Sequence, residues 1–204
     1  KQMTYGDGCF IVTDDVVAHE LTHGVTEHES GLFYYYQSGA INESFSDVWG
    51  EFTDLTNKMG NDSAAVRWLM GEETSIGAIR NMKNPPAFGD PDKMTSANYY
   101  SGSGDSGGVH SNSGINNKAA YLITDGGTFN GESITGLGIN KTAKIYYEVQ
   151  TNLLTSGADY NDLYNALYQA CNNLVGTSGI TLANCAQVRD ATDATEMNLQ
   201  PITG

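Results

Sequence analysis

Two histidines spaced four residues apart, with a glutamate directly after the first, are the residues most able to do chemistry. They stand in the sequence His19-Glu20-Leu21-Thr22-His23. On a helix, four steps of about 100° bring the second histidine to within roughly 40° of the first, one turn along. Two imidazoles placed in this way can hold one zinc ion, and Glu20 can take a proton from water at the metal. The alternative is two ordinary histidines on a helix.

A catalytic zinc ion needs a third protein ligand and an open position. One pattern of zinc peptidases places a glycine and a third histidine after the second histidine, but Thr26 and Glu29 occupy those positions here. A carboxylate from the next helix is the other choice. Glu43 follows His23 by 20 residues, which is enough for the chain to return across the first helix. We therefore assign Glu43 to zinc, and Asp47 to orienting a ligand histidine through its second ring nitrogen.

Four acidic residues, Glu43, Asp47, Glu51 and Asp54, are spaced four, four and three apart. On a helix they share one face over about 16 Å. One interpretation is a solvated acidic stripe. The other is burial beside the apolar residues of the same segment, and buried carboxylates need metals or hydrogen bonds. We favour the second, in which Glu51, Asp54 and Asp15 bind a hard cation such as calcium.

The elements that must position these residues are mostly helices. Apolar spacing predicts a buried helix over residues 13–29, a short extended piece over 32–37 and a helix over 40–58. An irregular stretch fills residues 60–113, and further helices are expected at about 112–125, 140–154, 160–175 and 184–194. Residues 1–5 predict a strand that runs into a turn at 6–8. The expected fold is mainly α, with a small β remnant at the N-terminal end.

Composition excludes some classes of partner. Acidic residues number 24 and basic residues 10 in the chain of 204, which gives a net charge of −14. Binding to nucleic acid requires a basic patch, and none stands out in the sequence. No stretch approaches the roughly 20 apolar residues of a membrane-spanning helix. We therefore expect neither a nucleic acid nor a membrane as a partner.

Three cysteines give a hint of the compartment. Cys171 and Cys185 enclose a short Gly-containing loop. A disulfide between them would be worth roughly 3 kcal/mol in the loop-entropy model, and disulfides suit an oxidising environment. The alternative is two reduced thiols. Cys9 is left over, either free or paired with a cysteine beyond this chain.

With these residues in place, the chain resembles the thermolysin-like zinc metalloendopeptidases. The matching segments are VVAHELTHGVT (16–26), SGAINE (38–43), SD (46–47), GGVH (107–110) and SGINNKAAYL (113–122). They span most of residues 1–125, and the helical remainder is compatible. The fold implied is the C-terminal helical lobe of that family. We expect residues 1–37 to hold a remnant of the β-rich lobe with the active-site helix, and residues 38–204 the helical lobe.

The resemblance implies roles for further residues. With His19, His23 and Glu43 as zinc ligands and Glu20 as general base, Tyr34 and His110 would stabilise the oxyanion of the tetrahedral intermediate. Asp105 would orient His110, Arg80 would bind a substrate carbonyl, and Glu72 would join the calcium ligands. The implied reaction is hydrolysis of protein or peptide substrates at internal bonds, before bulky apolar residues, by a secreted enzyme with one zinc ion and with calcium.

Two departures from the family pattern concern the upstream lobe and the calcium region. The β-rich lobe of relatives, with its substrate-pairing strand, would lie upstream of Lys1, so we expect it to be missing or to be a separate chain. In the calcium region, Arg67 stands where an acidic ligand is expected, with Asp62 as a substitute. Because the substrate-pairing strand would be absent, the alternative function is an inactive metal-binding fragment or partner-binding chain. An aminopeptidase would need an acidic anchor for the free amine of its substrate, and we identify none.

Overall fold

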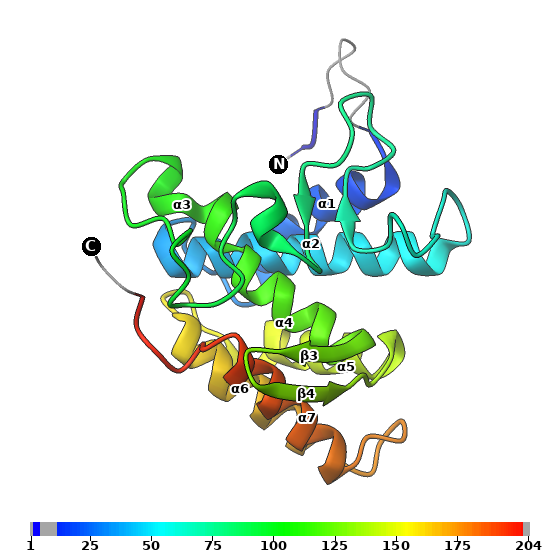
Figure 1. Cartoon of the computed structure of the whole chain (residues 1–204), viewed down its shortest axis with the longest axis vertical. Helices are drawn as coiled ribbons and strands as arrows, with labels where there is room; N and C mark the ends of the chain where they lie inside the picture. Colours follow the sequence, from blue (N-terminus) through cyan, green and yellow to red (C-terminus); the bar gives the residue numbers. More distant parts are fainter. Residues whose placement is uncertain (1, 5–11, 202–204) are drawn as a thin grey trace.

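The computed structural model of the chain describes residues 2–4 and 12–201 (Figure 1). Helices account for 53% of the described residues and strands for 6%, which confirms the mainly α class. In chain order the elements are α1 (Asp14–His28), α2 (Tyr36–Asn57), β1 (Leu69–Met70), β2 (Arg80–Asn81), the short 3-10 helix η1 (Pro85–Phe88), α3 (Asp105–Asn112), α4 (Gly114–Asp125), β3 (Gly126–Phe129), β4 (Glu132–Thr135), α5 (Ile139–Glu148), the π-helical turn η2 (Val149–Leu153), α6 (Tyr160–Asn173) and α7 (Leu182–Ala194).

Helix α2 is the long helix on which the site is built. It spans 22 residues, and its side chains are buried from Gly39 to Val48 without a break. In Figure 1 it runs across the upper tier, with α1 against it, while α4 descends from it toward the lower tier of α5, α6 and α7. A helix with apolar residues on all sides is buried by other elements on all sides. This burial fixes the direction in which the carboxylates of α2 point.

Helix α1 lies along α2, and its buried face is polar. The buried residues are Asp15, His19, Thr22 and Thr26, whereas Leu21 is 60% exposed. The expectation of an all-round buried helix was therefore wrong. The face of α1 that meets α2 is therefore polar and includes His19. The apolar side chains of α1 line open grooves away from this face.

The lower tier contains most of the apolar core. Leucine, isoleucine and alanine side chains of α4, α6 and α7 pack together there, and Phe45 of α2 stacks at 5.3 Å, between ring centroids, on Tyr146 of α5. A disulfide of 2.04 Å joins Cys171 of α6 to Cys185 of α7, as the sequence predicts. The core and the disulfide stabilise the lower tier, which lies beneath α2.

The β structure that is described lies later in the chain than expected. Strand β1 pairs antiparallel with β2, with Leu69 opposite Asn81. Strands β3 and β4 form a hairpin over residues 126–135, for which we predicted no element. The predicted N-terminal strand is not found where it can be checked, because residues 2–4 are described and have no regular secondary structure. The rest of that strand, the predicted turn and Cys9 lie outside the described residues.

Two helix boundaries also differ from the prediction. Helix α2 begins at Tyr36, in the run of aromatic residues whose β propensity favours a strand. The Ser38 hydroxyl donates hydrogen bonds to the carbonyls of Phe33 and Tyr35, which helps the chain to turn into the helix early. The predicted helix over 140–154 changes to a π-helical turn after Glu148. Within the described ranges, no helix is both long and apolar enough to cross a membrane.

Candidate metal and catalytic site

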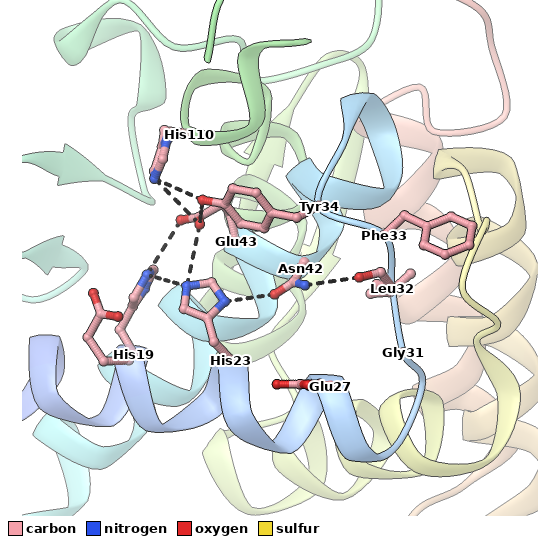
Figure 2. A pocket seen from close by; sticks show the side chains of 11 residues that line it. His19, His23, Glu27, Gly31, Leu32, Phe33, Tyr34, Asn42, Glu43 and His110 are labelled. Atoms are coloured by element: carbon pink, nitrogen blue, oxygen red, sulfur yellow. Dashed lines mark hydrogen bonds and ion pairs between the residues drawn. The ribbon is translucent and has the colours of Figure 1, made fainter. Parts of the chain in front are cut away.

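Three side chains from α1 and α2 converge on one point (Figure 2). The Nε2 atoms of His19 and His23 lie 3.1 Å apart. Each lies 3.4 Å from an oxygen of Glu43, His19 from Oε2 and His23 from Oε1. A tetrahedral zinc ion with bonds of about 2.0–2.1 Å separates its ligands by about 3.3 Å. The spacing of these donor atoms therefore fits one zinc ion.

The hydrogen bonding of the three residues fits a cation as well. Nδ1 of His23 lies 2.8 Å from Oδ1 of Asn42, and Nδ1 of His19 contacts Oδ1 of Asp47 at 2.9 Å without the alignment of a full hydrogen bond. When a cation replaces the proton of His19, these acceptors favour ring protons on Nδ1, and both Nε2 atoms are then free to bind it. Oε2 of Glu43 is buried and accepts no hydrogen bond in the described part of the chain. A cation would satisfy all three groups.

Asp47 contacts His19 and is fixed by hydrogen bonds from two other residues. It is fully buried, and Arg80 donates to it through Nε at 2.8 Å and Nη2 at 2.5 Å. Asn117 donates a third hydrogen bond at 2.7 Å. Burial would raise the pKa of Asp47, but the charge of Arg80 and the contact with His19 hold it below its usual range. Asp47 therefore stays ionised next to His19.

The two carboxylates beside His19 change its protonation. Burial would lower the pKa of His19, but contacts with Asp47 and Glu43 outweigh that effect and raise it to about 9. The local potential is therefore strongly negative. A site that holds a proton so firmly also favours a divalent cation, which must displace that proton on binding.

Tyr34 and His110 approach Glu43 from the opposite side. The Tyr34 hydroxyl donates to Oε1 of Glu43 and lies 3.2 Å from Nε2 of His110. Asp105 bonds both the Nδ1 atom (2.7 Å) and the backbone N–H (3.0 Å) of His110. Burial and the nearby Glu43 raise the pKa of Tyr34 above its usual range, so its hydroxyl remains protonated. Two potential hydrogen-bond donors therefore face the point where the ligands converge.

An open cavity of about 550 Å³ is lined by the three potential metal ligands together with Tyr34 and His110. Glu20 is also a lining residue. Gly31, Leu32 and Phe33 form the wall on the side of His23 (Figure 2). The sequence placed Glu20 next to the metal on motif spacing, and the structure puts it at the same cavity. The arrangement brings a candidate metal site, the carboxylate of Glu20 and two potential hydrogen-bond donors to one cavity.

Comparison with known proteins identifies the family. The sequence profile of the alpha-helical domain of thermolysin metallopeptidases matches residues 30–196, and that of their catalytic domain matches residues 1–27. The chain belongs to the thermolysin metallopeptidase family. The resemblance drawn from the sequence is thereby confirmed.

Individual thermolysin-family proteins show how far the likeness extends. The chain is 51% identical to a zinc metalloproteinase of Renibacterium salmoninarum over 95% of its length. It is 39% identical to a thermolysin of Alicyclobacillus acidocaldarius over 94%. It covers 36% of each of these two relatives. The solved precursor of protealysin, a metalloproteinase from Serratia proteamaculans, matches with a TM-score of 0.69 and 30% identity, over 91% of this chain and 58% of that one.

The predicted calcium ligands of this thermolysin-family chain carry mutual repulsion. Burial and neighbouring carboxylates raise the pKa of Glu51 to about 9, and those of Asp54 and Glu72 to about 7. Oε2 of Glu72 is buried without a hydrogen-bond partner in the ranges described, which suits a cation. Asp15 and Glu51, however, accept backbone hydrogen bonds from Gly71 and Trp68.

The two predicted metal sites differ in how closely their potential ligand atoms come together. Among the described residues, only His19, His23 and Glu43 meet as three or more potential ligands with donor atoms within 4.8 Å of one another. Arg67, at the position where an acidic ligand was expected, pairs with Asp125 instead. The calcium site therefore stays a prediction.

Two asparagines of the site were not singled out from the sequence. Asn42 accepts from His23 and also donates to the carbonyl of Leu32 at 3.3 Å, while Asn117 donates to Asp47. Both stand inside segments that carry the family resemblance. Asn42 directly precedes Glu43, and Asn117 lies in α4. Neither position indicates the contact partner, because His23 and Asp47 lie elsewhere in the chain.

Proposed function

We propose that this chain carries the catalytic centre of a secreted zinc endopeptidase that hydrolyses internal peptide bonds. The observation that carries the proposal is the convergence of two Nε2 atoms and a buried carboxylate at distances of 3.1 and 3.4 Å. Family membership supports the same reaction. Because the chain spans about a third of the curated relatives it matches, the activity of the whole protein is part of the proposal.

In this mechanism, His19, His23 and Glu43 hold the zinc ion. When bound, zinc polarises the scissile carbonyl and lowers the pKa of water at the site. Glu20 lines the same cavity and takes the proton of the attacking water, then delivers it to the leaving amine. Asp47 and Asn42 keep the two imidazoles in the tautomer that binds metal.

Tyr34 and His110 act on the charge that develops on the carbonyl oxygen. Their donor atoms lie 3.2 Å apart, so both can donate to one oxyanion. In the substrate-free chain, Glu43 accepts the Tyr34 hydrogen bond. Asp105 holds His110 by two hydrogen bonds and orients its ring so that Nε2 can face the oxyanion.

Substrate binding, specificity, secretion and calcium complete the proposal. Arg80 would bind a substrate carbonyl, and its guanidinium is already fixed by Asp47 next to His19. Hydrophobic residues would be preferred after the scissile bond, as the family resemblance implies. Secretion is supported by the disulfide between α6 and α7, since such bonds persist in oxidising compartments. Calcium would bind at Asp15, Glu51, Asp54 and Glu72.

Casein hydrolysis by the zinc-loaded chain tests the proposal. Glu20→Gln should lower kcat by about 10²–10⁴-fold, the range for loss of a general base, while zinc content stays the same. A chelator should abolish hydrolysis, and added zinc should restore it. Glu29→Gln, at the end of the same helix and outside the cavity, is the matched control. Zinc binding with no hydrolysis by the unmodified chain would favour the inactive metal-binding fragment instead.

A further inference from the structure

The turn that carries Asp105 has an unusual backbone. Asp105, Ser106, Gly107 and Gly108 all have positive φ, of 51°, 51°, 94° and 77°. Residues with a side chain avoid this left-handed region, so two of them in succession require support from the surrounding structure. This turn brings the carboxylate of Asp105 back onto the ring of His110. Whatever supports the turn therefore also sets the position of His110.

The ring of Tyr100 lies against this turn. A Cβ atom built on Gly108 would come within 2.6 Å of Cδ1 of Tyr100, and one built on Gly102 or Gly104 within 2.6 Å of its hydroxyl oxygen. The backbone thus packs closely on the side chain of Tyr100 at three glycines. The N–H of Gly104 donates to the Tyr100 hydroxyl at 3.1 Å. The carbonyl of Gly104 in turn accepts from Gly107 and Gly108, at 2.9 and 3.0 Å.

Tyr100 is itself tied to the body of the protein. The side chain of Asn112, at the end of α3, accepts from the Tyr100 N–H at 3.0 Å and donates to its carbonyl at 2.9 Å. Asn112 is buried, and its own carbonyl accepts from the hydroxyl of Tyr160 on α6 at 2.6 Å. The support of the turn thus runs from the lower tier through Asn112 to Tyr100. The ring of Tyr100 remains 40% exposed, so it is not a core residue.

We propose that Tyr100 is a positioning residue that holds the Asp105 turn and, through it, fixes the ring of His110 beside the metal ligands. The inference rests on the proposed peptidase function. Tyr100 lines no part of the cavity as described, so it acts through Asp105 and His110 rather than on the substrate. Its removal should therefore lower kcat and leave KM nearly unchanged.

A double-mutant cycle measures this dependence. Tyr100→Leu removes the ring and the hydroxyl, and should lower kcat by about tenfold or more, since small misplacements of a catalytic group cost up to about 10². In the His110→Ala background, Tyr100→Leu should cause no further loss, because the group that it positions is gone. Tyr100→Phe keeps the ring and should remain within about threefold of the unmodified chain. Tyr168→Leu, on α6, has similar exposure (38%) and serves as the control.

Nitrogen NMR of the four histidines gives a readout that needs no activity. With Asp105 as acceptor, the neutral ring of His110 should carry its proton on Nδ1. Tyr100→Leu should shift His110 toward a mixture of tautomers and leave His28 unchanged, while Tyr100→Phe should keep the original pattern. If Tyr100→Leu does not fold, Tyr100→Met, which fills most of the ring volume, is measured in the same way with the same expectation.

Two results would overturn the inference. One is an equal loss of kcat on Tyr100→Leu with and without His110, which would show a general structural effect. The other is an unchanged Nδ1 proton on His110 in Tyr100→Leu. If the unmodified chain hydrolyses no peptide at all, the proposed function fails, and the NMR comparison alone decides the role of Tyr100.

Discussion

The pairing of Asp47 with Arg80 leads to a prediction about both stability and metal binding. Asp47→Asn keeps the size of the side chain and removes its charge. The guanidinium of Arg80, whose side chain is only 11% exposed, would then lose its counter-ion in a buried setting. Nδ1 of His19 would also lose the ionised acceptor that lies 2.9 Å away. Both effects act on the same region behind the metal ligands.

The magnitude follows from burial. Removing one partner of a buried ion pair typically costs about 3–5 kcal/mol, because the other charge is left uncompensated. Domains of this size are stable by only about 5–15 kcal/mol, so the loss would be a large share of the total. Removing a group that orients a metal-bound histidine typically weakens metal affinity by about 10–100-fold. We expect losses in these two ranges for Asp47→Asn.

The chain offers a close control. Asp125 binds Arg67 through the same pair of nitrogen atoms, at 2.7 and 2.8 Å, but both side chains are 28–30% exposed. Exposed pairs contribute about 0–1 kcal/mol, so Asp125→Asn should cost little of the free energy of unfolding and leave zinc affinity unchanged. The assays are denaturant unfolding of the zinc-free chain and competitive zinc titration. Equal losses for the two variants, or full zinc affinity in Asp47→Asn, would refute the reasoning.

Two further predictions concern parts of the chain away from the metal. Burial would raise the pKa of Glu196, but hydrogen bonds from Lys93 and Thr95, among others, lower it to about 2. A depressed pKa stabilises the fold above the unfolded value of 4.5, and that contribution disappears as the pH falls toward 2. Glu196→Gln should therefore cost about 1–3 kcal/mol of unfolding free energy at pH 6, and the difference should shrink toward pH 2; a difference constant over that range would contradict it. Replacing Cys171 and Cys185 by serine should lower the free energy of unfolding by about 3 kcal/mol, and an unchanged denaturation midpoint would contradict the loop-entropy estimate.

The zinc-ligand geometry was the part of the site most accessible from sequence. The spacing of His19 and His23 fixes their relation on a helix, because helical periodicity is a local property. Glu43 could be chosen because a second helix of suitable phase follows at a distance that allows the chain to fold back. The helices and the disulfide were also predicted, since apolar periodicity and short loop closure are local signals as well.

Contacts between distant segments could not be predicted in the same way. Asn117 and Asp47 are 70 residues apart, and neither neighbourhood indicates the other. The hairpin over residues 126–135 has glycines and short polar residues in place of a clear alternating pattern. The positive φ angles of Asp105 and Ser106 belong to a turn that packs on the ring of Tyr100, a contact that no local sequence pattern indicates. Sequence patterns thus indicated the candidate site residues, and the contacts that position them depend on the tertiary structure.

The central claim is that His19, His23 and Glu43 bind one zinc ion together. X-ray absorption spectroscopy of the chain loaded with one equivalent of zinc tests it most directly, with Glu43→Gln measured alongside. We predict a signal from two imidazole nitrogens and oxygen ligands without sulfur, and a weaker zinc affinity in Glu43→Gln. A sulfur contribution, a single imidazole, or equal zinc affinity in the two proteins would contradict the account.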